Sequence, residues 1–142
     1  MSVIGKRVIN AGCGGNKDYH PLKIEGAAVV EIPAGSFVSE VATGIDLSVA
    51  DQGELLIADK DEFRTRSVDE PWAIGDNVQA FKARSGEFYN VLFPAGVTVT
   101  SGAGIAIDAG GLAKLAATPA EAVCFADENV VTTATQLVRI RV

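Results

Sequence analysis

Residues 137–142 read LVRIRV, and their aliphatic side chains alternate with arginines. In an extended chain Val138, Ile140 and Val142 share one face, and the two arginines lie on the other. This alternation predicts a strand that buries one of its faces.

Similar runs recur from Gly26 onward, each short and rich in β-branched or aromatic residues. Gly, Asp and Pro residues separate six of them, which are residues 28–32, 55–58, 77–83, 88–93, 97–100 and 105–107. Turn signals at intervals of roughly 8–12 residues are typical of a sandwich or barrel, and not of alternating strands and helices. We therefore predict a mainly β chain.

The turns between these runs carry their own signals. Residues 83–86 and 108–111 are both interpreted as hairpin loops, because Gly supplies the positive φ that tight connections need. The sequence Pro-Ala-Gly occurs at residues 33–35 and again at residues 94–96, each time between hydrophobic runs. This weak repeat suggests two related halves of one β domain.

Helical signals are few. Residues 118–121 have the form of a helix cap with Pro at the first position, although a strand over residues 122–125 is the favoured alternative. Residues 51–63 offer a second possible short helix.

Composition indicates one folded core. Of the 142 residues, 48% are hydrophobic and 21% are charged, so the chain can bury enough surface to fold without a metal or disulfide. We see no apolar stretch of about 20 residues and no signal-peptide pattern, which predicts a protein made in the cytoplasm that does not bind membranes. Cys13 and Cys124 match no metal or redox spacing, and we expect both to be reduced.

Charge divides the chain into two parts. Residues 1–25 are rich in Gly, lack periodicity and carry a net charge of +2, so the remaining 117 residues account for −8 of the total of −6. We interpret residues 1–25 as an extended N-terminal arm and residues 26–142 as the β-rich domain. Because acids outnumber basic residues, we expect no binding to nucleic acid.

The candidate partner-binding residues follow from this division. Lys6, Arg7, Lys17 and Lys23 could meet an acidic protein surface, although a solvated tail explains them equally well. Trp72 is the only tryptophan and follows a loop signal, so it is either an exposed anchor for a partner or a core residue beneath the loop.

Possible catalytic or metal sites are weak. Residues 7–16 resemble the glycine-rich turn of S-adenosylmethionine-dependent methyltransferases, but the residues after Asn16 stop a helix instead of starting one. His20 is the only histidine, and with Cys13 it would give a metal too few ligands. Acidic clusters at residues 59–62 and 127–128 do not follow a calcium-loop pattern.

The C-terminal half, in contrast, resembles the small β-rich proteins that decorate the heads of tailed bacteriophages. The similarity is carried by short motifs in residues 93–99, 101–115, 122–126 and 138–142, with a similar turn at residues 75–78. It covers about residues 26–142, and the glycines of the leader are not matched.

This resemblance implies a small β-barrel or tulip-like domain that binds the outer surface of an assembled capsid. It implies the major capsid protein as partner and a homotrimer at three-fold positions, with each copy bridging capsid subunits as a cement protein. The family has no catalytic residues to carry over, so the chain is expected to be no enzyme and to need no cofactor or metal. Another phage structural module, such as a head fibre base, a tail component or a receptor-binding component, is the alternative, and a methyltransferase-like enzyme is a third.

Overall fold

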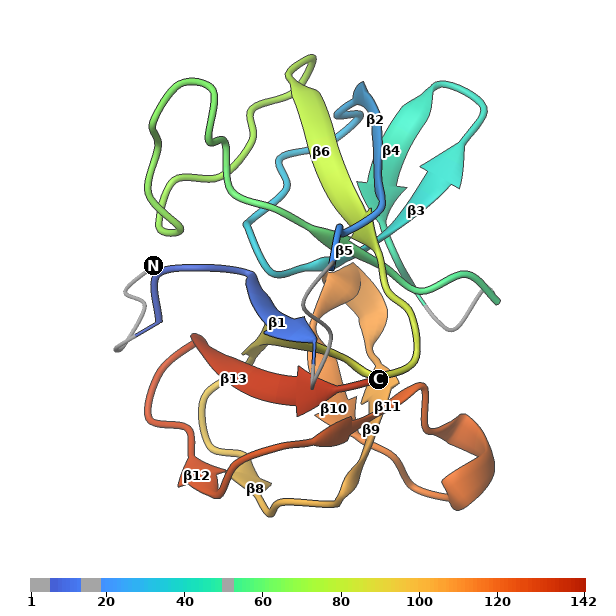
Figure 1. The fold of residues 1–142 in the computed structure, drawn as a ribbon, viewed down its shortest axis with the longest axis vertical. Coiled ribbons are helices and arrows are strands. Elements are labelled where there is room, and N and C mark those ends of the chain that lie inside the picture. Colours follow the sequence, from blue (N-terminus) through green and yellow to red (C-terminus); the bar gives the residue numbers. More distant parts are fainter. Residues whose placement is uncertain (1–5, 14–18, 50–52) are drawn as a thin grey trace.

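The computed structural model describes residues 6–13, 19–49 and 53–142, and it is mainly β (Figure 1). Its strands are β1 (Asn10–Cys13), β2 (Lys23–Ala27), β3 (Phe37–Val41), β4 (Gly44–Leu47), β5 (Leu56–Ala58), β6 (Asn77–Lys82), β7 (Glu87–Phe93), β8 (Thr98–Val99), β9 (Gly104–Ile107), β10 (Ala113–Leu115), β11 (Cys124–Ala126), β12 (Val130–Val131) and β13 (Gln136–Arg141). Two short 3-10 turns, η1 (Ala109–Gly111) and η2 (Pro119–Glu121), complete the described elements. In this part of the chain, no helix has the length and hydrophobicity that crossing a membrane requires.

The strands form two main sheets and a small ribbon. The first sheet has the order β1-β7-β13-β11-β9-β10, the second has the order β2-β6-β5-β3-β4, and β12 pairs with β8. Neighbouring strands are antiparallel in all three. The mainly β prediction is therefore confirmed, whereas the closed barrel is wrong, because two separate sheets pack in a sandwich-like arrangement.

The second sheet buries both of its faces. Phe37, Ile57 and Phe81 point into the main core, where the ring of Phe81 lies 5.5 Å from that of Tyr89 in β7. The residues that alternate with them, such as Val38, belong to a separate small core. This period of two places the second sheet between two hydrophobic layers.

The second sheet also curls strongly. Ala28, just after β2, forms a parallel bridge with Ile45 in β4, and the Val29 amide donates to the Ile45 carbonyl at 3.0 Å. Gly44 allows this approach, because it has φ of 147° and a Cβ there would overlap the carbonyl oxygen of Ala27. A glycine is required where two backbones come this close.

The repeated Pro-Ala-Gly sequences form similar turns. Gly35 and Gly96 have φ values of 87° and 82°, and the turns lead into β3 and β8. A third turn, at Gly75 with φ of 87°, leads into β6. The first and third turns lie next to each other, because Ile32 and Trp72 exchange backbone hydrogen bonds of 3.0 and 2.8 Å.

The described part of residues 1–25 packs against both sheets. β1 pairs with β7, β2 pairs with β6 along its whole length, and Ile9 is only 1% exposed in the main core. The Ile9 carbonyl accepts from the amide of Asn90 at 2.8 Å. This segment is extended, as the sequence indicates, but it contributes core and ladder contacts; the division into an arm and a domain at residue 25 stays a prediction.

The turn predictions have different outcomes. Residues 108–111 do form a hairpin loop between β9 and β10, with Gly110 and Gly111 at φ of 79° and 75°. Residues 83–86 do not, because β6 and β7 belong to different sheets. The strand favoured after Pro119 is confirmed as β11, and residues 53–63 contain strand β5 where a helix was considered.

Candidate interaction surface

A long loop connects β5 to β6 and displays the most exposed large hydrophobic side chains of the described residues. It spans residues 59–76, which we call the 59–76 loop. Phe63 is 83% exposed and Ile74 is 72% exposed. Structured loops longer than about 12–15 residues are uncommon and are usually functional.

Trp72 holds this loop against the small core. It is 2% exposed, and its Nε1 donates to the backbone carbonyl of Asp59 at 2.7 Å. The core position left open by the sequence is therefore confirmed, and Trp72 as an exposed partner anchor is wrong. Packing in the small core, together with the backbone bonds to Ile32, leaves this indole no surface to offer a partner.

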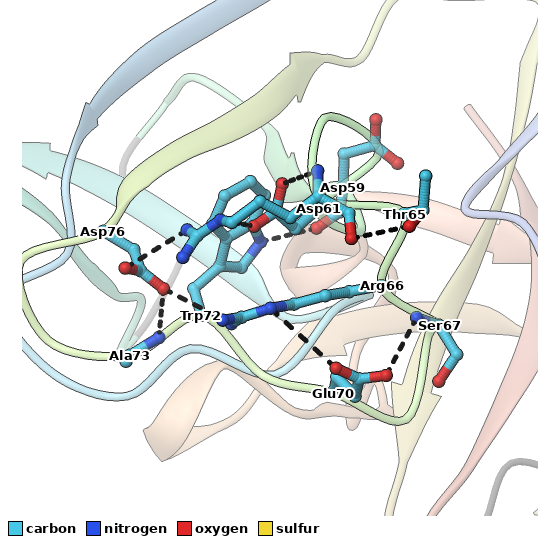
Figure 2. A network of polar contacts seen from close by, with 10 residues as sticks. Asp59, Asp61, Thr65, Arg66, Ser67, Glu70, Trp72, Ala73 and Asp76 are labelled. Atoms are coloured by element: carbon cyan, nitrogen blue, oxygen red, sulfur yellow. Dashed lines mark hydrogen bonds and ion pairs between the residues drawn. The ribbon is translucent and has the colours of Figure 1, made fainter.

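Ion pairs connect the two sides of the 59–76 loop (Figure 2). The Arg64 guanidinium lies 2.6 Å from the buried carboxylate of Asp61 and 3.2 Å from that of Asp76. Arg66 lies 3.6 Å from Asp76 and 3.8 Å from Glu70. Single exposed ion pairs contribute little, but several that share partners restrict one another and hold the two sides of the loop together.

Backbone hydrogen bonds complete the loop. The amide of Ala73 donates to the Asp76 carboxylate at 2.8 Å, and this bond, together with Arg64 and Arg66, lowers the pKa of Asp76. The amide of Thr65 donates to the carbonyl of Glu62 at 3.1 Å, which closes a turn with Phe63 at its corner. Thr65 has φ of 53°, a conformation that β-branched residues rarely adopt.

The exposure of Phe63 is the feature that sequence reasoning missed. Aromatic side chains are enriched among the few residues that dominate protein interfaces. Charged neighbours at Glu62 and Arg64 hid the signal, since the segment reads as a solvated loop. The one clue in the sequence was that Phe63 is an aromatic residue between two charged residues.

The predicted basic residues do not form one cluster. Lys6 Nζ lies 3.1 Å from the Glu128 carboxylate, whereas Lys23 Nζ lies 2.9 Å from Asp59 and 4.9 Å from the ring centre of Phe81.

Burial of Asp59 raises the pKa of its carboxyl, and the hydrogen bond from Lys23 opposes that rise.

Arg7 is exposed, and its backbone carbonyl accepts from Lys60 at 3.2 Å. Lys17 lies outside the described residues. A role of these basic residues in partner binding stays a prediction.

A buried carboxylate links the N-terminal segment to β7. Glu87 is 1% exposed and accepts from the hydroxyls of Tyr19 and Tyr89 at 2.5 and 2.9 Å. It also accepts from the backbone amide and the guanidinium of Arg84 at 2.6 and 3.2 Å. Burial raises the pKa of Glu87, but these hydrogen bonds outweigh it and the net shift is downward. Because four donors share this one carboxylate, Glu87 has a structural role and holds the N-terminal segment against β7.

We expect Glu87→Gln to destabilise the fold by about 1–3 kcal/mol at neutral pH, because an amide places a donor against donors. A lowered pKa means that the stabilisation by Glu87 is complete above the usual carboxyl pKa and is lost as pH falls through the folded value. The difference in unfolding free energy between wild type and variant should therefore shrink as pH falls below the usual carboxyl pKa and through the lowered one. Urea unfolding at several pH values measures it, with exposed Glu40→Gln as control. A difference independent of pH would contradict the charge-based explanation.

Comparison with known proteins bears on the fold. No protein-family model matches the chain, and no curated protein matches it. Among solved structures, it matches the crystal structure of the head fiber gp8.5 N base in bacteriophage phi29, with a TM-score of 0.56 and 17% sequence identity. The match covers 87% of this chain and 94% of that chain. The chain is similar in fold to a phage head fibre base.

The remaining motifs gain no support from their surroundings. Residues 14–16 of the glycine-rich segment lie outside the described residues, and the described elements on either side of them are strands β1 and β2. Cys13 and Cys124 are both free, and burial raises the pKa of Cys124 to about 12. His20 is exposed, and no group of three or more potential metal ligands occurs within the described ranges.

Proposed function

We propose that this chain is a structural component of a tailed-phage head that attaches to the outer surface of the assembled capsid. The observation that carries the proposal is the fold, which matches a head fibre base over 94% of that chain. The sequence motifs that resemble head decoration proteins support the same class.

The exposed surface fits a binding function. The 59–76 loop presents an aromatic side chain on a prearranged support, which is what a protein interface needs. Glu87, the buried carboxylate next to two tyrosines, has its hydrogen-bonding capacity taken up by the fold, so we assign it no catalytic step. In this proposal the chain acts by adding contacts between major capsid protein subunits, and many weak contacts together resist internal pressure.

A second candidate is the base of a head fibre, which the similarity to the phi29 base favours directly. The two candidates differ in number and in partners. A decoration protein covers the shell in many copies, whereas a fibre base carries a further fibre segment and is attached at fewer positions.

Quantitative mass spectrometry of purified particles of the encoding phage tests the proposal. We expect the chain in these particles, and its copy number relative to the major capsid protein separates decoration from fibre base. Particles assembled without the chain should bind the purified chain when it is added. The matched target is a shell that contains the major capsid protein alone. Absence of the chain from particles, with no binding to such shells, would overturn the proposal.

A further inference from the structure

One short segment of the 59–76 loop is shaped by polar contacts alone. Between Lys60 and Ser67 its single hydrophobic residue is Phe63, which is 83% exposed, so this segment buries no hydrophobic side chain. The next hydrophobic residue, Val68, is 1% exposed in the main core and fixes the end of the segment. The path of residues 60–67 therefore depends on the bonds that its polar groups make.

Arg64 makes the central bonds of this segment. Its guanidinium lies 2.6 Å from the carboxylate of Asp61 and 3.2 Å from that of Asp76, so it joins the start of the loop to its end. Asp61 is 3% exposed, and its carboxylate also accepts from the backbone amide of Arg64 at 3.2 Å. The Arg66 amide donates to the Asp61 carbonyl at 2.9 Å, which closes the turn that carries Phe63.

This turn has three features that cost free energy. The phenyl ring of Phe63 is left in water, the carboxylate of Asp61 is removed from water, and Thr65 adopts φ of 53°. Among the described residues, Thr65 is the only one other than glycine with positive φ. Strained backbone conformations cluster at functional sites, so the three features together indicate that this turn serves a contact with a partner.

The charge of the 59–76 loop indicates the chemistry of that partner. Six acidic and three basic residues give the loop a formal net charge of −3. Glu62, next to Phe63, is exposed. An aromatic side chain that projects from an acidic loop fits an apolar pocket with a basic rim.

We propose that Phe63 inserts into such a pocket on the outer surface of the capsid, and that Arg64 positions Phe63 by joining Asp61 to Asp76. This inference rests on the proposed function, because it names the contact through which the chain attaches to the shell. Phe63 touches the partner, Glu62 faces the basic rim, and Arg64 is a positioning residue that acts through Phe63.

Co-sedimentation of the purified full chain with capsid shells that contain the major capsid protein alone tests this contact. We expect Phe63→Ser to weaken binding by about 10- to 100-fold, because it removes the ring from the pocket. Since Phe63 is 83% exposed, this variant should keep the wild-type melting temperature. Phe125→Ser is the matched control and should bind as wild type does, because Phe125 is also an exposed ring, at 47%, but lies in β11 of the first sheet.

A double-variant cycle tests the role of Arg64. Arg64→Ala should weaken binding by about 3- to 10-fold in the wild-type chain and by less than about 2-fold in Phe63→Ser, because Arg64 acts through the ring. Arg141→Ala is the control and should have no effect, since its side chain is 43% exposed and also pairs with an aspartate, Asp127, at 3.1 Å. Equal weakening by Arg64→Ala with and without Phe63 would contradict a positioning role.

Glu62→Gln tests the basic rim. At low salt it should weaken binding by about 2- to 5-fold, and the difference should disappear at high salt, because salt screens exposed charges. Stronger binding by this variant would show that the rim is acidic and would overturn the charge of the proposed pocket.

The same shells separate this inference from the proposed function. If wild type binds the shells and Phe63→Ser binds them equally well, the inference is overturned and the proposed function stands. A wild-type chain that does not bind the shells at any concentration would overturn both.

Discussion

Ile9→Ala is expected to lower the free energy of unfolding by about 2–4 kcal/mol, because it leaves a cavity in the main core. Ile9 is 1% exposed, and its Cδ1 lies next to the Gly35 turn. Its carbonyl accepts from the Asn90 amide at 2.8 Å, so the surrounding backbone is held in place and cannot collapse freely.

The neighbouring residue supplies the control for this variant. Val8 is 47% exposed, and Val8→Ala should change the unfolding free energy by no more than about 0.5 kcal/mol. Guanidinium unfolding followed by the fluorescence of Trp72, the single tryptophan, measures both variants. Equal, small effects would show that residues 1–25 are a separable arm, as the sequence suggested, and that their packing contributes nothing to the fold.

Gly44→Ala is expected to cost about 3 kcal/mol or more, for two reasons that add. Gly44 has φ of 147°, which is unfavourable for a residue with a side chain. The new methyl group would also overlap the Ala27 carbonyl oxygen, and no side-chain rotation can relieve the overlap because that oxygen belongs to the backbone.

Gly96→Ala separates these two causes. Gly96 also has positive φ, at 82°, but a Cβ there meets no atom within 4 Å. This control should cost about 1 kcal/mol, from backbone conformation alone. For a chain of this length, 1 kcal/mol corresponds to roughly 2–4 °C in melting temperature, so thermal unfolding resolves the two variants. Equal melting temperatures would contradict the close approach of β2 and β4.

Strands with strong alternation were predictable from sequence. Residues 77–83 and 88–93 correspond closely to β6 and β7, and residues 137–142 correspond to β13. β1, β2 and β4 were missed, because glycine and polar residues interrupt their alternation and tertiary pairing alone holds them extended. Residues 28–32 were predicted as a strand but make only isolated bridges at Ala28 and Ile32.

The pairing of the strands was harder to predict from sequence than the strands themselves. Residues 83–86 have the composition of a hairpin loop, yet they lead from one sheet to the other. Local turn chemistry specifies a change of direction, but the choice of partner depends on which hydrophobic faces meet. Closure of a barrel was likewise not predictable from local sequence, because it requires the edge strands to pair and not only to approach each other.

The candidate surface was the least predictable part. Trp72 and Phe63 both lie in a charged loop, and the sequence could not show that one is buried and the other exposed. The burial of Trp72 rests on contacts between residues far apart in the chain, namely packing in the small core and its backbone bonds to Ile32. The loop that carries Phe63 is likewise held by pairs such as Arg64 with Asp76, twelve positions apart. Lys23 likewise meets Asp59 only because β6 pairs with both β2 and β5, the strand that Asp59 follows.

The position of β7 has a consequence for how the protein folds during synthesis. β7 lies between β1 and β13, two strands from distant parts of the chain. The second sheet uses only residues 23–82 and can pair as soon as these have left the ribosome.

The first sheet can form only later in synthesis. β1 is made early but has no partner until β7 appears, and the centre of the sheet is incomplete until residues 136–141 are available. Long-range pairing of this kind is slow. During that interval Phe37, Ile57 and Phe81 lack their cover, so the nascent chain exposes an aromatic and aliphatic surface that a chaperone or a neighbouring chain can bind.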